Sequence, residues 1–134
     1  MTAADALFRC GFPYVKTLGM RRVTSAAVDV VPGSDNLVYV LVRADLPQGG
    51  CCIRVLNWED EDLGTIGETG SGDGQFSWPA KLLIDNDGNL IVSDEALNRI
   101  TVMSKDGTFL YKWGHSGQKE GQLNRPSGMA FDKD

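Results

Sequence analysis

The stretch GETGSGDGQFSWP (residues 67–79) recurs further along the chain as GHSGQKEGQLNRP (residues 114–126). The flanking glycines, the Gly-Gln pair and the final proline align at one constant offset. The same offset carries Ile53 onto Ile100 and Asp85 onto Asp132. One offset that holds over so many positions identifies an internal repeat, whose period falls in the range of roughly 40–50 residues typical of several repeat folds.

Within the clearest copy, short apolar runs alternate with turn sequences. Asn86–Asn89 and Lys105–Gly107 are typical hairpin turns, rich in Asn, Asp and Gly. The runs between the turns favour β-strands, and Ile100–Met103 alternates as a half-buried strand does. The four predicted strands are 81–85, 90–92, 100–103 and 109–113. Four antiparallel strands in one repeat predict a blade of a β-propeller, and hence an all-β fold.

A less regular copy precedes the clear one. Its predicted strands are 26–31, 37–42, 53–57 and 63–66. A longer offset carries Val40 onto Val92, so we assign Leu46–Gly50 as an insertion between the second and third strands. The prediction is a single partial propeller domain over residues 1–134, with four parts. These are the last strand of a preceding blade (1–23, with the strand at Tyr14–Leu18), a degenerate blade (24–71), a well-matched blade (72–118) and the start of the next blade (119–134, with a strand at Gly128–Asp132).

The motif of residues 67–79, together with Val92-x-Asp94 and Asn98-Arg99-Ile100-x-Val102, resembles an NHL repeat. The resemblance covers residues 67–113 almost throughout and the opening of a further repeat in 114–134. The first blade departs from it, because Cys51-Cys52 stands in place of Asn98-Arg99, and Leu41 or Val42 stands near the place of Asp94. The resemblance implies a propeller of about six blades, of which this chain supplies about two and a half. We therefore expect either a longer chain or self-assembly of several copies.

Composition limits the partners. The 134 residues carry a formal net charge of −5, the wrong sign for a dedicated nucleic-acid binder. The acidic run Glu59–Asp62 is interpreted as a solvated turn between strands. Three cysteines, two of them adjacent, form a poor disulfide framework and favour reduced thiols. No signal peptide or membrane-spanning run is visible, so we expect no membrane partner and favour a cytoplasmic location.

The candidate binding residues lie on one end of the predicted blades. Connections between the second and third strands, and between successive blades, share that end, and scaffolds carry function on such loops. The candidates are Trp78, Asp94, Glu95, Asn98, Arg99, His115 and Arg125. Each also has a structural interpretation: Asp94 and Arg99 as hydrogen-bonding residues of the turn, Trp78 as inter-blade packing, and His115 as a solvated side chain.

No catalytic residue, metal site or cofactor is predicted from the spacing of residues. The favoured function is a non-enzymatic NHL-repeat scaffold that binds a protein or a small ligand through its loops. The alternative is a fragment of a metal-dependent propeller enzyme, similar to peptidyl-hydroxyglycine lyases or lactonases. With one histidine in the chain, most ligands of such a site would have to come from further blades.

Overall fold

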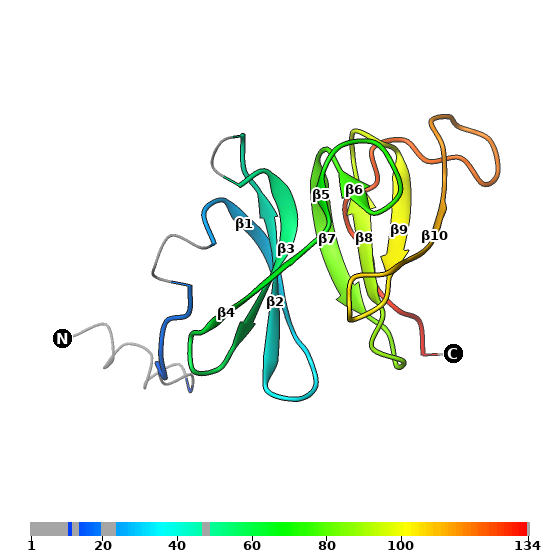
Figure 1. Ribbon diagram of the computed structural model, residues 1–134. Helices are drawn as coiled ribbons and strands as arrows, with labels where there is room; N and C mark the ends of the chain where they lie inside the picture. Colours follow the sequence, from blue (N-terminus) through cyan, green and yellow to red (C-terminus); the bar gives the residue numbers. More distant parts are fainter. Residues whose placement is uncertain (1–10, 12–13, 20–23, 47–48, 134) are drawn as a thin grey trace.

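The computed structural model describes residue 11 and residues 14–19, 24–46 and 49–133. The described residues form two four-stranded antiparallel sheets that stand side by side (Figure 1). The first sheet, in the order β1-β2-β3-β4, contains β1 (Ala27–Pro32), β2 (Leu37–Arg43), β3 (Cys51–Asn57) and β4 (Asp62–Ile66). The second has the same order and contains β7 (Pro79–Ile84), β8 (Leu90–Asp94), β9 (Arg99–Met103) and β10 (Phe109–Trp113). The predicted four-stranded antiparallel sheets are confirmed, and the described part of the chain is all-β.

The linker between the blades forms a small sheet of its own. Strand β5 (Glu68–Thr69) pairs in parallel with β6 (Gln75–Phe76). The Phe76 ring is fully buried between the two blades, where the linker closes their junction. The repeated pattern of glycines in this linker has a steric reason at Gly67. Its φ is +76°, and a Cβ there would lie 2.4 Å from the Phe76 ring.

The main hydrophobic core lies between the two sheets. Leu41 and Ile53 of the first blade are fully buried there with Leu82, Leu90 and Val92 of the second. A second cluster covers the opposite face of the first blade and includes Val38, Val40, Val42, Cys52 and Leu56, with Leu18 packed against it. Strand alternation therefore places the adjacent cysteines on opposite faces, Cys51 in the inter-blade core and Cys52 in the outer cluster.

An ion pair joins the innermost strands of the two blades. Asp29 of β1 lies 3.2 Å from the Lys81 ammonium of β7, and its carboxylate also accepts a hydrogen bond from the Leu82 amide at 2.8 Å. Both strands have a register irregularity next to these residues. Leu82 lies on β7, which is an edge strand, so its backbone N–H has no neighbouring strand to bond to. The Asp29 carboxylate accepts a hydrogen bond from this N–H instead.

The far face of the second blade is a groove of about 470 Å³. Tyr111, Trp113 and Phe131 line it and are each more than half exposed. The predicted strand at Gly128–Asp132 is wrong: this segment lies along the groove without pairing as a strand. The predicted strand at Tyr14–Leu18 is also wrong, since residues 14–19 are described and form no strand. Neither segment pairs with a strand among the described residues, and an extended run without a paired strand cannot form a ladder.

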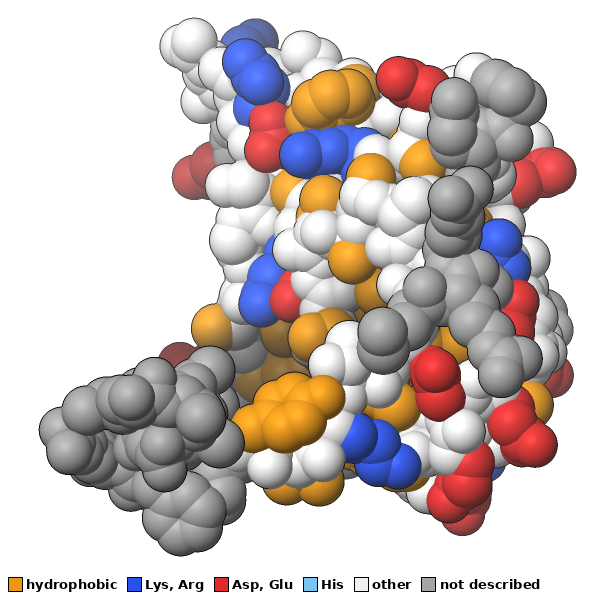
Figure 2. Space-filling model, turned by 90° about the vertical axis from the view of Figure 1, so that its left-hand side faces the viewer, with side chains coloured by type: hydrophobic (Ala, Val, Ile, Leu, Met, Phe, Trp, Pro, Cys, Tyr) orange, Lys and Arg blue, Asp and Glu red, His pale blue; other side chains and the backbone are white. Residues whose placement is uncertain are grey.

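The acidic run forms the β3–β4 turn, as predicted, and three of its four residues are exposed. The Asn57 side chain accepts hydrogen bonds from the amides of Glu59 and Glu61, which orders this turn. Figure 2 faces the side of the first blade and shows acidic side chains gathered at its lower right. Within the part of the chain that is described, there is no helix that could span a membrane.

Candidate functional site

The two ends of the blades differ as predicted. The tight hairpins β1–β2, β3–β4, β7–β8 and β9–β10 lie at one end, and the longer connections lie at the other (Figure 1). We call the second end the loop end; it comprises residues 44–46 and 49–50 of the β2–β3 connection, and residues 67–78, 95–98 and 114–125. Four of the seven predicted site residues gather there around one pocket.

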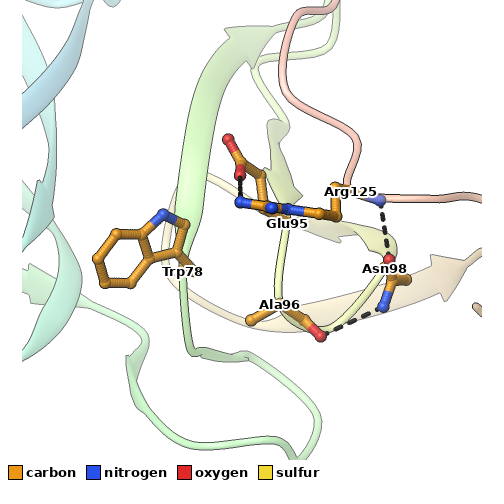
Figure 3. A pocket seen from close by; sticks show the side chains of 5 residues that line it. All are labelled: Trp78, Glu95, Ala96, Asn98 and Arg125. Atoms are coloured by element: carbon orange, nitrogen blue, oxygen red, sulfur yellow. Dashed lines mark hydrogen bonds and ion pairs between the residues drawn. The ribbon is translucent and has the colours of Figure 1, made fainter.

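That pocket, of about 450 Å³, is lined by Trp78, Glu95, Ala96, Asn98 and Arg125 (Figure 3). We call it the loop-end pocket. The β8–β9 turn contributes Glu95, Ala96 and Asn98. Trp78 lies immediately before β7, and Arg125 lies in the linker after β10. Three segments that are distant in sequence therefore build one depression.

Arg125 is tied to the β8–β9 turn at two points. Its guanidinium lies 3.1 Å from the Glu95 carboxylate, and its backbone N–H donates to the Asn98 side-chain oxygen at 2.8 Å. Asn98 and Arg125 both adopt left-handed backbone conformations, with φ of 52° and 50°. Asn tolerates this region better than most residues, and here its amide also donates to the Ala96 carbonyl. The backbone of the pocket is therefore held in place while the Arg125 side chain remains 74% exposed.

Trp78 forms the other wall of the pocket. Its indole is 47% exposed, and the Arg43 guanidinium lies over the ring at 4.2 Å from the centroid. This geometry is a cation–π contact. Arg43 ends β2 of the first blade, so the contact crosses the junction between the blades.

The Arg43–Trp78 and Glu95–Arg125 pairs occupy equivalent places in successive repeats. Arg43 follows Val42, which pairs with Ala27 at the start of β1. In the same way, Glu95 follows Asp94, which pairs with Pro79 at the start of β7. Trp78 and Arg125 each precede the proline of the repeated motif. One pair is a cation–π contact and the other is an ion pair, so the same position carries different chemistry at each junction.

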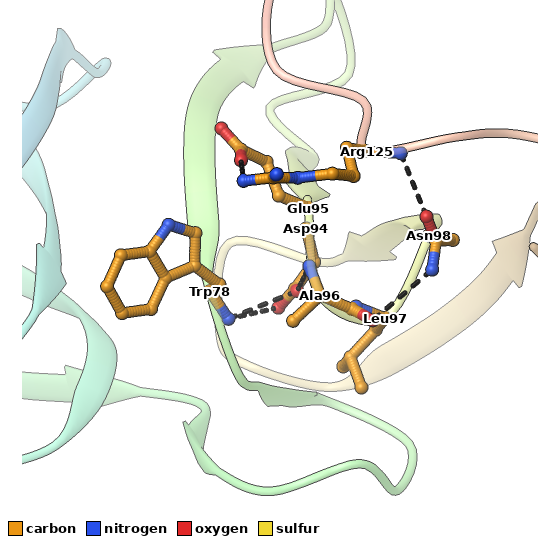
Figure 4. A network of polar contacts seen from close by, with 7 residues as sticks. All are labelled: Trp78, Asp94, Glu95, Ala96, Leu97, Asn98 and Arg125. Atoms are coloured by element: carbon orange, nitrogen blue, oxygen red, sulfur yellow. Dashed lines mark hydrogen bonds and ion pairs between the residues drawn. The ribbon is translucent and has the colours of Figure 1, made fainter.

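Asp94 supports the pocket from below (Figure 4). It is fully buried, and its carboxylate accepts hydrogen bonds from the amides of Ser77, Trp78, Ala96 and Leu97 at 2.7–3.1 Å. These bonds connect the β8–β9 turn to the segment before β7. All of them point within the protein, which gives Asp94 a positioning role.

Arg99 is likewise directed inward. It is 7% exposed, and its guanidinium donates to the carbonyls of Ser71, Gly72 and Gln75 at 2.6–3.0 Å. Its Nε is buried without a partner among the described atoms. The guanidinium therefore closes the β5–β6 linker, and it does not line the loop-end pocket.

His115 lies apart from the loop-end pocket. It is exposed on the linker after β10, and its Nε2 is 3.1 Å from the Gln122 side-chain nitrogen. The equivalent positions of the preceding repeat, Glu68 and Gln75, are bonded in the same way at 2.9 Å. This correspondence makes His115 part of the repeated linker.

No group of three or more His, Cys, Asp or Glu side chains comes together among the described residues as a metal site would require. Burial raises the pKa of the Cys51 and Cys52 thiols, which disfavours the reactive thiolate. The geometry of the loop-end pocket offers an aromatic face, a cation and a carboxylate, which is chemistry suited to binding.

Comparison with known proteins agrees with the repeat pattern. No family model matches the chain. The chain is 33% identical over 68 residues to RING finger protein nhl-1 of Caenorhabditis elegans, and 33% identical over 65 residues to the brain tumor protein of Drosophila melanogaster. It is 43% identical over 48 residues to lin-41 of Caenorhabditis elegans. These matches cover 51%, 48% and 36% of the chain.

The chain is thus similar to NHL-repeat proteins, as its repeat pattern indicates. It covers only 7%, 6% and 4% of the length of these three relatives. A crystal structure of a Bacteroides fragilis protein matches 73% of the chain and 27% of its own length, with a TM-score of 0.58. At 21% identity, this last likeness concerns the fold alone.

The structure places two residues at the loop end that the sequence did not single out. Ala96 lines the loop-end pocket, and Arg43 covers the Trp78 ring. The longer offset that carries Val40 onto Val92 also carries Arg43 onto Glu95, so the repeat itself contained the signal for Arg43. For Ala96 the sequence holds no such signal, because its side chain carries no polar or aromatic group.

Proposed function

We propose that the chain is a non-enzymatic NHL-repeat binding module that holds a partner protein at its loop end. The observation that carries this proposal is the loop-end pocket, in which Trp78 and Arg125 stay exposed while Asp94 and Arg99 are used up by internal hydrogen bonds. Trp and Arg are the residue types most enriched among the energetically dominant positions of protein interfaces. The similarity to NHL-repeat proteins supports a binding role in general.

Two features make the loop end suitable for recognition. The backbone of the pocket is ordered by the hydrogen bonds that the Asp94 and Asn98 side chains accept from it, so little conformational entropy is lost when a partner binds. The exposed side chains also come from the two linkers that flank the second blade, Trp78 from the linker before β7 and Arg125 from the linker after β10. A partner that contacts both would therefore require both linkers to be correctly packed on the blade.

Site-specific photo-crosslinking tests the proposal. A photoreactive amino acid is placed at Ala96, which is exposed in the loop-end pocket, and as a matched control at Asn86, which is exposed in the β7–β8 hairpin at the other end. We expect a discrete crosslinked partner protein from position 96 and none from position 86. A partner captured equally from both positions, or only from position 86, would contradict the assignment of the loop end.

A further inference from the structure

The Arg125 guanidinium is the most accessible cation of the loop-end pocket. It is 74% exposed, and its one ion pair among the described residues engages a single nitrogen, which lies 3.1 Å from the Glu95 carboxylate. A guanidinium has five N–H donors in a planar fork, so one edge of Arg125 remains available to a second acceptor. Glu95 is only 21% exposed and lies deeper, which leaves that edge facing solvent.

An apolar surface lies beside this cation. Trp78 presents a half-exposed indole, and the exposed Ala96 lies between it and Asn98 on the pocket wall (Figure 3). The Arg43 guanidinium over the ring holds the indole in place. A ligand that fits this pocket therefore combines a planar acceptor group with an apolar group next to it.

The charge balance of the pocket disfavours a ligand with several negative charges. The two guanidinium groups, Arg43 and Arg125, are matched by Glu95 and by the buried Asp94, whose carboxylate is bound by four backbone amides. The whole chain carries a net charge of −5. A polyanion such as nucleic acid would be repelled at long range, whereas one carboxylate can be accepted at short range by a single exposed fork.

Resting on the binding function proposed above, we propose that the loop-end pocket binds an extended segment of a partner protein that carries one acidic side chain next to an apolar one. The carboxylate bonds to the free edge of Arg125, and the apolar side chain packs on Trp78. The open, shallow form of the depression suits a peptide lying across it, with its backbone exposed on the outer side.

A phage-displayed library of short random peptides, selected on the immobilised 134-residue chain, provides the probe. We expect the enriched peptides to share one Asp or Glu beside a Leu, Ile, Phe or Trp. The most enriched peptide is then synthesised with a fluorescent label, together with an analogue whose carboxylate is replaced by the amide, and both are measured by fluorescence anisotropy.

We expect the amide analogue to bind about tenfold or more weakly, since a charge-assisted hydrogen bond is lost. Arg125→Gln should weaken the acidic peptide to the same level as the amide analogue, and the two losses should not add. Trp78→Ala should weaken both peptides. The matched control is Arg54→Gln, which removes another ion-paired surface arginine, 3.2 Å from Asp62, and should bind as the wild-type chain does. Thermal unfolding of each variant confirms that its fold is retained.

Peptides that bind at Trp78 but tolerate the amide analogue and Arg125→Gln would overturn the acidic ligand and leave the loop-end binding function standing. A fluorescent single-stranded RNA that binds more tightly than any peptide and depends on Arg125 would overturn it in favour of nucleic acid. If no selected peptide is affected by Trp78→Ala or Arg125→Gln, the proposed function itself fails along with this inference.

Discussion

Asp29 and Lys81 hold the same position in successive blades and bond to each other across the junction between them. The longer offset that carries Val40 onto Val92 carries Asp29 onto Lys81, and their charged groups lie 3.2 Å apart. The repeat thus supplies both partners of one contact. Asp29 has the larger structural task, because its carboxylate also accepts the Leu82 amide.

We expect Asp29→Ala to lower the free energy of unfolding by about 1–3 kcal/mol, because the Leu82 amide would be left without its acceptor. Lys81→Ala should cost less than about 1 kcal/mol, since its side chain is 37% exposed and surface ion pairs contribute little. Urea denaturation followed by tryptophan fluorescence measures both. Equal losses of stability in the two variants would show that the junction is stabilised by the ion pair and not by the hydrogen bond from the Leu82 amide.

Arg99→Ala should destabilise the chain by about 3 kcal/mol, because three carbonyls of the β5–β6 linker lose a charged donor. Arg99→Lys should recover little, since an ammonium group lacks the planar fork that spans several carbonyls. Arg54→Ala is the control and should change the free energy of unfolding by about 1 kcal/mol or less. Loss of ligand binding with an unchanged melting temperature would instead assign Arg99 to the binding surface.

The buried thiols should be unreactive in the folded chain. Burial raises the pKa of both Cys51 and Cys52, so less thiolate is present at a given pH than in the unfolded chain. With Cys10 replaced by Ser, we expect Ellman's reagent to label neither thiol rapidly under native conditions and both in urea. Because the two side chains lie on opposite faces of β3, mass spectrometry should find no disulfide between them. Rapid labelling of either thiol would contradict their burial.

The β7–β8 turn should contribute a pH-dependent part of the stability. Slight burial of Asp85 acts to raise its pKa, but hydrogen bonds from Asn89 and Asp87 outweigh that effect, and the pKa lies below its usual value. A lowered folded-state pKa stabilises the fold above the unfolded pKa of about 3.9, and this stabilisation is lost as the pH falls through the folded pKa.

Urea midpoints measured from about pH 6 down to about pH 2 should therefore fall less steeply in Asp85→Asn than in the wild-type chain. Asp87→Asn is the matched control in the same turn, because its exposed carboxylate accepts none of the turn's hydrogen bonds. A pH dependence that is the same in all three proteins would exclude Asp85 as its source.

The groove on the second blade should cause the isolated chain to self-associate. Tyr111, Trp113 and Phe131 expose more than half of their surface there, and apolar patches of this kind promote association. We expect a molar mass that rises with concentration in light scattering, and a reduction of this effect by Tyr111→Lys. Leu110→Lys is the control, since Leu110 lies on the same strand but does not line the groove. If both variants reduce association equally, added charge and not the groove is responsible.

The strands of both blades could be predicted from the sequence, because each is a short apolar run bounded by glycine-rich or Asx-rich turns. Leu90–Val92 and Phe109–Trp113, for example, agree with β8 and β10 at their starts. Tyr14–Leu18 and Gly128–Asp132 have similar local patterns and are not strands. A strand depends on a neighbour that donates and accepts its hydrogen bonds, and a local pattern contains no information on whether that neighbour is present.

The site could be predicted only in part. Position in the repeat placed Trp78, Glu95, Asn98 and Arg125 at one end of the fold, where they share a pocket. Their distribution into exposed and internally bonded groups depends on the linker geometry. The Arg125 guanidinium reaches solvent, whereas the Arg99 guanidinium bonds to three carbonyls. The fold of the β5–β6 segment against the blade decides the environment of Arg99.

The alternating chemistry of the junctions has a consequence for how blades find their neighbours during folding. Exchanging the two blades' partners would bring Arg43 beside Arg125 and Glu95 beside the Trp78 ring, which replaces two attractive contacts by two repulsive ones. Similar repeats risk pairing out of order, since their cores are nearly interchangeable. The charged and aromatic residues at each junction thus favour pairing with the next repeat in the chain over pairing with a similar repeat elsewhere.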